Sequence, residues 1–352
     1  MARLLSAATE SPPHRIGFEQ MSRIVSRHLK EHQIAPEPYL RILRSTRIEH
    51  RHMVRGEDDA DRDATFKTNN DLYIKTCLEL GEKVSRAAIQ RAGLVPQDID
   101  SIISVSCTGF MIPSVDAYLI DRMQLRPNVR RTPITLLGCM AGAVALSRAW
   151  EQLQAYPGSR ILVLSIELPS LTFQPRDHRP AQVISSMLFA DGAAAMVVSN
   201  QPAGRPSPRI LGSRMYTMPG TIPDMGYDLD DDGLHIVLSA NVPTLIKKTL
   251  GCEVEGLLAQ HGVTRADVKW CAMHPAGPKV LKLVEEELGF DSTQLAASWK
   301  ILRDHGNMSS AAVLYVLAEM LENPPARPGE LGLIVGFGPG VTGEILLARW
   351  EA

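Results

Sequence analysis

Two similar stretches of sequence, GCMAGA at 138–143 and GNMSSA at 306–311, predict the fold of this chain. Each follows an apolar, strand-like segment, the first ending at Cys107 and the second at His274. Cys139 lies 32 residues after Cys107, and Asn307 lies 33 residues after His274. A further apolar segment begins 22 to 24 residues after Cys139 and Asn307. This repeated order indicates two duplicated α/β halves, each with a largely buried sheet covered by helices.

A linker separates the two halves. Residues 201–208 read QPAGRPSP, with three prolines and one glycine, which is typical of an irregular connection. We therefore expect an N-terminal half at 1–200, which contains Cys139, and a C-terminal half at 201–352, which contains His274 and Asn307. A pseudo-two-fold axis between the halves would bring these three residues and Cys107 together.

Composition excludes several classes of protein. The chain has 352 residues, 45% of them hydrophobic and 22% charged, with a net charge of −2. This balance is typical of a globular protein and argues against a general nucleic-acid binder. The apolar stretches are too short to span a membrane, and the N-terminus is too short for a secretory signal. Five widely spaced cysteines without a C-x-x-C pair predict neither a disulfide framework nor a zinc site, so we expect a reduced cytoplasmic setting.

Cys139 is the candidate nucleophile. It follows a glycine and opens a predicted helix rich in small residues. The free N–H groups and partial positive charge of a helix start favour a thiolate, so we expect a lowered thiol pKa. The alternative is that Cys139 is simply a small buried apolar residue.

His274 and Asn307 are the candidate partners of Cys139. His274 ends an apolar strand and precedes the rigid turn Pro275–Pro278, which suits a positioned base. Asn307 matches Cys139 across the repeat, although a helix cap would also explain an asparagine there. Most other histidines, including His28, His32 and His178, lie in charged or loop contexts and are expected at the surface.

A Cys–His–Asn set indicates acyl transfer, because a thiol can hold an acyl group while an imidazole and an amide donate to an oxyanion. Papain-like proteases use the same three residue types, but their cysteine signature is absent from this sequence.

The sequence resembles the chalcone synthase-like type III polyketide synthases of the thiolase superfamily over nearly its whole length. The resemblance lies in LLGCMAGA at 136–143, MHPAGP at 273–278, HGNMSSAAVL at 305–314 and VGFGPGVTGE at 335–344. Ketoacyl synthases of the type III class share the catalytic trio, but usually read GNTS and GFGGG in the last two motifs. The resemblance implies a thiolase-like fold, with two duplicated α/β halves in a layered αβαβα arrangement.

The resemblance also implies a reaction. Cys139 would load an acyl group, and His274 and Asn307 would stabilise the oxyanion during decarboxylation and condensation of malonyl-CoA. The substrates would be malonyl-CoA and an acyl-CoA, the enzyme would be a homodimer, and neither a metal nor another cofactor would be required. A catalytically silent scaffold is the alternative from another class, and the intact trio argues against it.

Further residues are implied by position. Phe189 matches a gatekeeper aromatic between the coenzyme A tunnel and the cavity, and Ile236 replaces a second one. The other implied cavity residues are Cys107, Thr108, Thr172, Tyr227 and Ser309, and Ile112 falls on the loop that reaches the partner subunit. The implied coenzyme A cations are Arg41, Arg44, Arg47 and Lys279, although a solvated helix face would also explain the arginines.

The starter unit is the least determined prediction. The segments at 167–173 and 225–234 resemble alkylpyrone and alkylresorcinol synthases, and the aliphatic Ile236 would admit an alkyl chain. We therefore expect a fatty acyl starter, with Tyr227 as the main obstacle to it. Cys107 matches a cysteine of naphthalene-forming bacterial relatives, which leaves a tetrahydroxynaphthalene-type synthase using malonyl-CoA alone as an alternative. A ketoacyl-ACP synthase III is the other alternative function.

Overall fold

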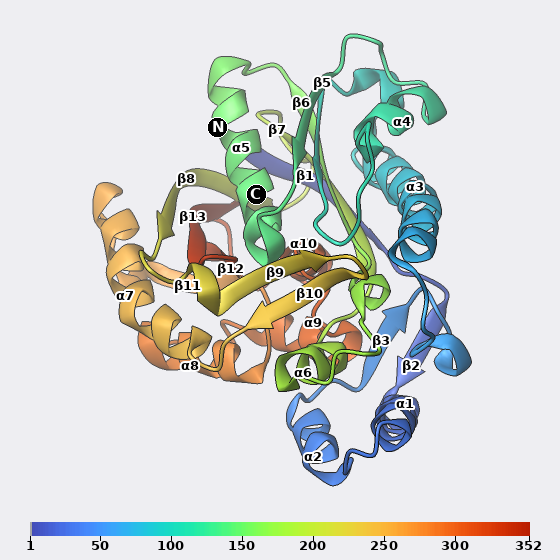
Figure 1. Ribbon diagram of the computed structural model, residues 1–352. Coiled ribbons are helices and arrows are strands. Elements are labelled where there is room, and N and C mark those ends of the chain that lie inside the picture. The colour runs from blue at the N-terminus through green and yellow to red at the C-terminus, as the bar shows by residue number, and fades with distance from the viewer. Residues whose placement is uncertain (1) are drawn as a thin grey trace.

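The computed structural model describes residues 2–352 (Figure 1). Its helices are α1 (Phe18–Glu31), α2 (Glu37–Ser45), α3 (Phe66–Arg91), α4 (Val115–Arg122), α5 (Ala141–Ala155), α6 (Pro180–Leu188), α7 (Val242–Gln260), α8 (Pro278–Leu288), α9 (Ala296–His305) and α10 (Ala311–Glu322). Its strands are β1 (Ala2–Glu10), β2 (His14–Gly17), β3 (His50–Met53), β4 (Ser101–Val105), β5 (Arg130–Ile134), β6 (Arg160–Glu167), β7 (Gly192–Ser199), β8 (Ser207–Thr217), β9 (Met225–Asp230), β10 (Gly233–Leu238), β11 (Val268–Met273), β12 (Leu331–Gly338) and β13 (Thr342–Glu351).

The predicted duplication is visible in the strand order. A nine-stranded sheet runs β11-β12-β13-β8-β1-β7-β6-β4-β5. In the N-terminal half, β1, β7 and β6 pair antiparallel and β4 joins β6 in parallel. In the C-terminal half, β8, β13 and β12 pair antiparallel and β11 joins β12 in parallel. The halves meet at β1 and β8, which pair only through Ala2–Ile210 and Arg3–Arg209.

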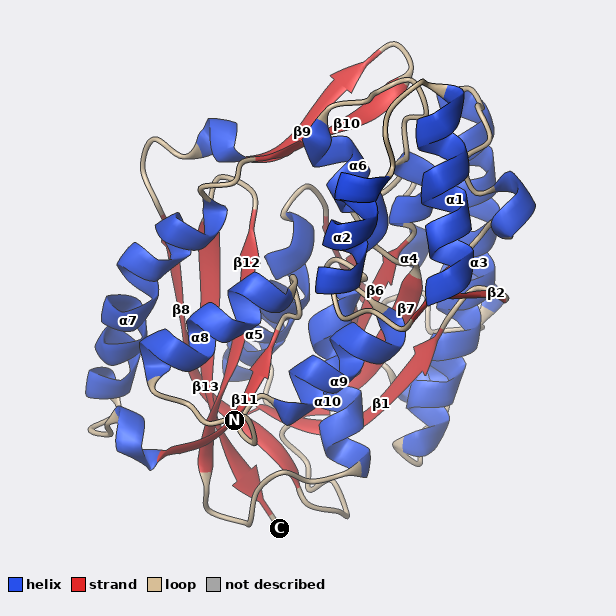
Figure 2. Cartoon of the chain, turned by 90° about the horizontal axis from the view of Figure 1, so that it is seen from below, coloured by secondary structure: helices blue, strands red, loops and turns tan. Residues whose placement is uncertain are grey.

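Two helices form the layer between the halves. Helices α5 and α10 contact each other, α5 contacts strands of both halves, and α10 contacts β1, β7, β11 and β12 (Figure 2). Helices α3 and α4 cover the N-terminal half, and α7 and α8 the C-terminal half, which gives the five layers of a thiolase-like fold. The central helices approach closely at Gly142, where a Cβ atom would lie 2.1 Å from the carbonyl oxygen of Ser310. A larger residue there would force the two helices apart.

The remaining elements cover one end of the layered core. The two-stranded sheet β2–β3, the hairpin β9–β10 and helices α1, α2 and α6 belong to this cover (Figure 1). Met21 and Leu29 of α1 and Ile16 of β2 have buried side chains that belong to one hydrophobic cluster. The cover matters for function because it closes over the ends of β4, β11 and the central helices.

The apolar patterns of the sequence predict strands at 160–167 and 268–273 and a helix at 278–288, and β6, β11 and α8 have these bounds. Three expectations were wrong. The first residues form β1, although the sequence analysis read them only as a brief apolar patch. The acidic stretch before Gly233, predicted as a loop, contains β9, which pairs with β10. The predicted helix from Asn307 begins only at Ala311, so Asn307 is not its cap. Within residues 2–352, the helices are too short or too polar to cross a membrane.

Candidate active site

Cys139 and Asn307 occupy matching places in the two halves. Cys139 lies in a short 3₁₀ turn, Gly138–Met140, immediately before α5. Asn307 lies three residues before Ser310, the N-cap of α10. Both side chains are more than nine-tenths buried. The structure therefore places the predicted nucleophile and amide beside the starts of the two central helices.

Ser309 connects the predicted residues. Its hydroxyl oxygen lies 3.5 Å from the Cys139 sulfur and 3.7 Å from the Cys107 sulfur. Its backbone N–H donates to Asn307 Oδ1 at 2.9 Å. Ser309 has a left-handed backbone with φ +49°, which is unusual for a residue other than glycine, and this turn directs its hydroxyl towards the thiols. Two cysteines, an amide and a hydroxyl thus form one cluster across the seam.

His274 reaches the same region from the end of β11. Its backbone N–H donates to the Val335 carbonyl at 2.8 Å, and Asn307 Nδ2 donates to the Ala276 carbonyl at 3.3 Å. The imidazole is fully buried, and neither ring nitrogen has a hydrogen-bond partner among the described residues. A buried imidazole with both nitrogens free is available to a substrate.

Burial is the main cause of the pKa shifts of Cys139 and His274. It raises the pKa of the Cys139 thiol to about 12 and lowers the pKa of His274 to about 3. The hydrogen bond to Ser309 works against the first shift but does not offset it. The expectation of a lowered Cys139 pKa is therefore wrong for the free protein, because the cost of placing a thiolate in a dry site exceeds the benefit of a helix start. The resting pair is a neutral thiol and a neutral imidazole.

Glu167 is a site residue that the sequence analysis missed. It is fully buried at the end of β6, and its carboxylate accepts hydrogen bonds from the Cys107 N–H at 3.1 Å, the Thr108 hydroxyl at 2.9 Å and the Ser310 hydroxyl. Its oxygens also lie 3.5 and 3.6 Å from the Cys107 sulfur. Burial raises its pKa. A single acid at the end of the otherwise apolar strand RILVLSI was the signal that could have identified it.

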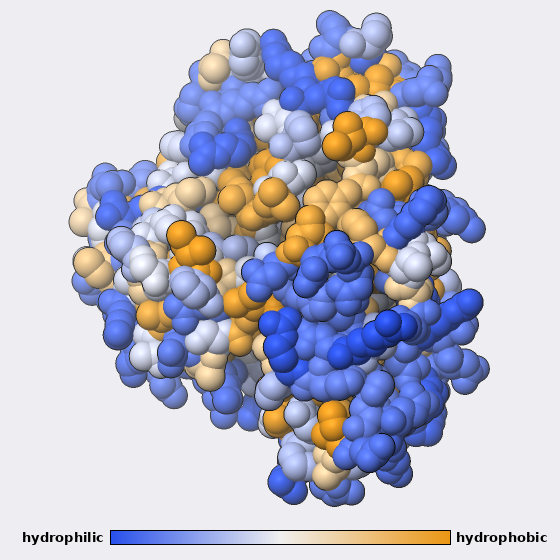
Figure 3. Space-filling view, in the orientation of Figure 1, coloured by the Kyte–Doolittle hydropathy of each residue, from blue (hydrophilic) through white to orange (hydrophobic). Residues whose placement is uncertain are grey.

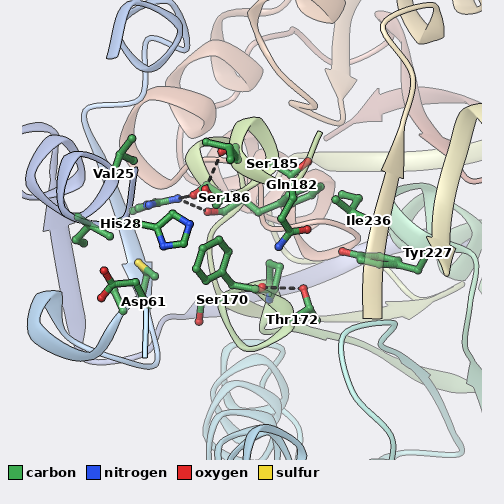
Figure 4. Close-up of a pocket in the computed structure, with 18 residues that line it drawn as sticks. Val25, His28, Asp61, Ser170, Thr172, Gln182, Ser185, Ser186, Tyr227 and Ile236 are labelled. Carbon is green, nitrogen blue, oxygen red and sulfur yellow. Dashed lines mark hydrogen bonds between the residues drawn. The ribbon is translucent and has the colours of Figure 1, made fainter. Parts of the chain in front are cut away.

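The predicted cavity residues fall into two groups. Phe189, Thr172, Tyr227 and Ile236 line one cavity of about 50 Å³, with His28 and Tyr227 on opposite sides of it (Figure 4). Cys107, Thr108 and Ser309 surround Glu167 instead. Burial raises the pKa of Tyr227, and hydrogen bonding to Thr172 works against that shift. The phenol therefore stays neutral and forms part of the cavity wall.

The predicted coenzyme A cations are separated. Arg44 and Arg47 line a surface groove of about 790 Å³ together with Lys282, Lys300 and Arg303. The Arg47 guanidinium lies 5.1 Å from the centre of the Trp299 ring, a cation–π contact. Arg41 and Lys279 are exposed on α2 and α8, and neither is among the residues that line this groove.

Ile112 is unusually exposed for an apolar residue. Its side chain is 97% exposed, and the nearby Phe110 is also exposed. Both lie in the turn between β4 and α4. Figure 3 shows apolar residues across the middle of the molecule, whereas the surface over α1 is mostly hydrophilic. An exposed isoleucine and phenylalanine in one turn are typical of a protein–protein contact.

Comparison with known proteins identifies the family. Residues 12–202 match the N-terminal domain of chalcone and stilbene synthases, and residues 211–350 match the C-terminal domain. The chain belongs to this family, whose members are type III polyketide synthases, and it is an acyl-condensing enzyme.

Several of the relatives are bacterial enzymes. The chain is 33% identical to the 1,3,6,8-tetrahydroxynaphthalene synthase of Streptomyces peucetius subsp. caesius, with 97% of this chain and 91% of the relative covered. It is 30% identical to the phloroglucinol synthase of Pseudomonas fluorescens, with 97% of each covered. The crystal structure of the tetrahydroxynaphthalene synthase of Streptomyces coelicolor A3(2) superposes with a TM-score of 0.94 at 32% identity, covering 99% of each chain.

Proposed function

We propose that the chain condenses malonyl-CoA onto an acyl group held as a thioester on Cys139. The observation that carries the proposal is the cluster in which Ser309 joins the Cys139 thiol to Asn307, whose amide donates to the turn that follows His274, an imidazole with two free nitrogens. As Cys139 attacks the thioester of an acyl-CoA, its proton passes to His274 and coenzyme A leaves as the thiol. The site then holds the starter covalently.

Extension uses the same residues. Malonyl-CoA loses its carboxylate as carbon dioxide, and the electron pair of the broken bond forms an enolate. Asn307 Nδ2 and an N–H of His274 donate to the enolate oxygen, because developing negative charge in a dry site needs fixed donors. The enolate carbon attacks the acyl carbonyl on Cys139, the new carbon–carbon bond forms, and the carbon–sulfur bond breaks, so that Cys139 leaves as a thiolate and takes a proton from water. The lengthened chain is now a thioester of coenzyme A, and it returns to Cys139 by the loading step before the next extension. Repeated cycles and ring closure give the aromatic or pyrone product.

We propose malonyl-CoA itself as the first candidate for the starter. The cavity that contains Tyr227 and Ile236 holds about 50 Å³, well below the roughly 300 Å³ at which pockets for drug-sized ligands begin. The two relatives described above are named for small aromatic products. A fatty acyl starter, predicted from the sequence, is the second candidate, and the aliphatic wall formed by Ile236 and the neighbouring Ile24 and Val25 favours it.

Two surface features support assignments for coenzyme A binding and for the assembly of subunits. We assign the coenzyme A phosphates to the cationic groove of Arg44 and Arg47, with Arg41 and Lys279 on the adjoining helices. We assign the exposed turn at Ile112 to the contact between the subunits of a homodimer. The reaction as proposed uses no metal or organic cofactor, because a thiol, an imidazole and an amide perform each step.

One experiment tests the function and both starters. Purified enzyme is incubated with malonyl-CoA alone and with a series of acyl-CoA starters from acetyl to hexadecanoyl, and the products are identified by mass spectrometry. A small aromatic product from malonyl-CoA alone supports the first candidate. Alkylpyrones or alkylresorcinols support the second, and a single acetoacetyl-type condensation product would contradict a polyketide synthase.

A further inference from the structure

Three histidines from distant parts of the sequence gather beside the cavity. His28 lies in the last turn of α1, His32 is the C-cap of that helix, and His178 lies in the segment between Phe173 and α6. One potential ligand atom of each lies within 4.8 Å of those of the other two. The ring centres of His32 and His178 are 4.0 Å apart, and those of His28 and His32 are 5.0 Å apart.

Two buried nitrogens of this cluster lack hydrogen-bond partners within residues 2–352. His28 is only 5% exposed, yet its Nε2 has no hydrogen-bond partner among the described residues, and the same holds for Nδ1 of His178. A buried polar nitrogen without a partner costs free energy. Two such nitrogens in one cluster are therefore rare unless a bound ion or water satisfies them. Two nearby acids have other partners: Asp61 is held by Arg27 through bonds of 2.6 and 3.0 Å, and Asp177 pairs with Arg179 and His235.

We propose that His28, His32 and His178 bind a divalent transition-metal ion, with zinc as the first candidate. Imidazole nitrogens are preferred ligands of zinc, and histidines four residues apart on a helix present two of them to one ion. Zinc–nitrogen bonds of about 2.0–2.1 Å place two nitrogens of a tetrahedral centre about 3.3 Å apart. The present separations need a closure of at most about 1.5 Å for each pair, which is within reach of small rotations of the three imidazole rings. Water or another small ligand completes the coordination.

The proposed metal site borders the cavity described above. His28 lines the same cavity as Phe189 and Tyr227, and its ring lies 5.2 Å from that of Phe173 (Figure 4). An ion held by all three histidines ties α1 to the segment before α6, and both border this cavity. Metal binding therefore stabilises the cavity wall without entering the condensation. The sequence analysis predicted a protein without a metal, and the proposed site departs from that expectation. Nothing in the sequence indicated that His178 lies near His28, because the two residues are far apart along the chain.

The test uses full-length protein without a histidine tag, freed of metal with a chelator and then titrated with Co²⁺ and Zn²⁺. We expect one Co²⁺ per chain with the visible absorption of nitrogen ligation, displacement by Zn²⁺, and a raised melting temperature with either ion. His32→Ala and His178→Ala should each weaken binding by more than about 100-fold, because loss of a direct ligand exceeds the 10–100-fold cost of losing an outer partner. His261→Ala, which alters an exposed histidine outside the cluster, should bind as the unaltered protein does.

Three results would overturn the proposal. One is substoichiometric binding by the unaltered protein. Another is equal binding by His32→Ala, His178→Ala and His261→Ala. The third is a near-ultraviolet thiolate-to-cobalt charge-transfer band, which would place the ion on a cysteine such as Cys139. Melting curves recorded without metal show whether each variant folds, and the two ligand variants are independent, so failure of one to fold leaves the other to decide. The condensation assay is separate from all these readouts.

Discussion

The backbones of Phe189 and Asn307 lie side by side as a single parallel β-bridge. The Asn307 N–H donates to the Leu188 carbonyl at 3.0 Å, and the Ala190 N–H donates to the Asn307 carbonyl at 2.9 Å. The segment that carries the predicted gatekeeper is therefore attached directly to the segment that carries the predicted oxyanion donor. A movement of α6 that widens the cavity would also move the Asn307 amide, so cavity shape and catalytic geometry are coupled.

The first prediction concerns proton removal from Cys139. His274→Ala should slow alkylation of Cys139 by iodoacetamide at pH 7 by at least about 100-fold, because a positioned base contributes that much. Burial raises the thiol pKa to about 12, so the thiolate fraction in the variant grows as pH rises towards that value. Alkylation of the variant should rise about tenfold per pH unit between pH 7 and 10. Peptide mass spectrometry measures the rate, and the exposed Cys252 provides an internal control. Equal rates with and without His274 would remove it as the base.

The second prediction separates decarboxylation from condensation. Cys139→Ala should abolish condensation but retain release of carbon dioxide from malonyl-CoA, whereas Cys107→Ala should retain some of both. In the Cys139→Ala background, Asn307→Ala should lower carbon dioxide release by about 10²–10³-fold, as loss of an oxyanion donor does. Labelled malonyl-CoA measures both activities. Undiminished release in the double variant would exclude Asn307 from the oxyanion site.

The third prediction concerns Glu167. Its carboxylate accepts from Cys107, Thr108 and Ser310, so Glu167→Gln replaces one acceptor oxygen with an NH₂ group facing donors. We expect a loss of about 1–3 kcal/mol in the free energy of unfolding, the cost of leaving buried donors unsatisfied. Denaturant unfolding measures it, with Glu322→Gln, an exposed acid, as the control. An unchanged stability would show that the network tolerates a neutral amide.

The fourth prediction concerns assembly. Ile112→Asp should weaken the proposed homodimer, since a charge would replace an apolar side chain that is 97% exposed in the single chain. Sedimentation should show a mass of two chains for the unaltered protein and a concentration-dependent shift towards one chain for the variant. Ile222→Asp, at another exposed isoleucine, is the matched control. A monomeric unaltered protein at micromolar concentration would contradict the proposal.

The site residues at equivalent positions of the two halves could be predicted from the sequence. The site residues that only tertiary packing brings together were missed. Cys139 and Asn307 stand out because equivalent helix starts carry them, and His274 stands out because its strand matches the one ending near Cys107. Glu167 and the bridging position of Ser309 depend on packing between the halves, which no local pattern encodes. The thiol pKa was mispredicted for a related reason, because the helix start is local whereas the burial comes from packing of its turn against β12 and β13 of the other half. His178 approaches His28 only because the segment before α6 folds back onto α1.

The last prediction concerns the starter. Tyr227 and Ile236 lie on the wall of a cavity of about 50 Å³, so the unaltered enzyme should react with malonyl-CoA alone and extend decanoyl-CoA poorly. Tyr227→Ala removes the phenol and should raise kcat/KM for decanoyl-CoA relative to acetyl-CoA, because each methylene that becomes buried contributes about 0.8 kcal/mol. Tyr227→Phe keeps the ring and should change little, which separates the volume of the side chain from its hydroxyl. Ile236→Trp should fill the cavity further and lower the use of every starter longer than acetyl. Mass spectrometry of products from the acyl-CoA series measures these preferences. Rapid extension of decanoyl-CoA by the unaltered enzyme, left unchanged by Tyr227→Ala, would show that the alkyl chain occupies another space and would favour the fatty acyl candidate.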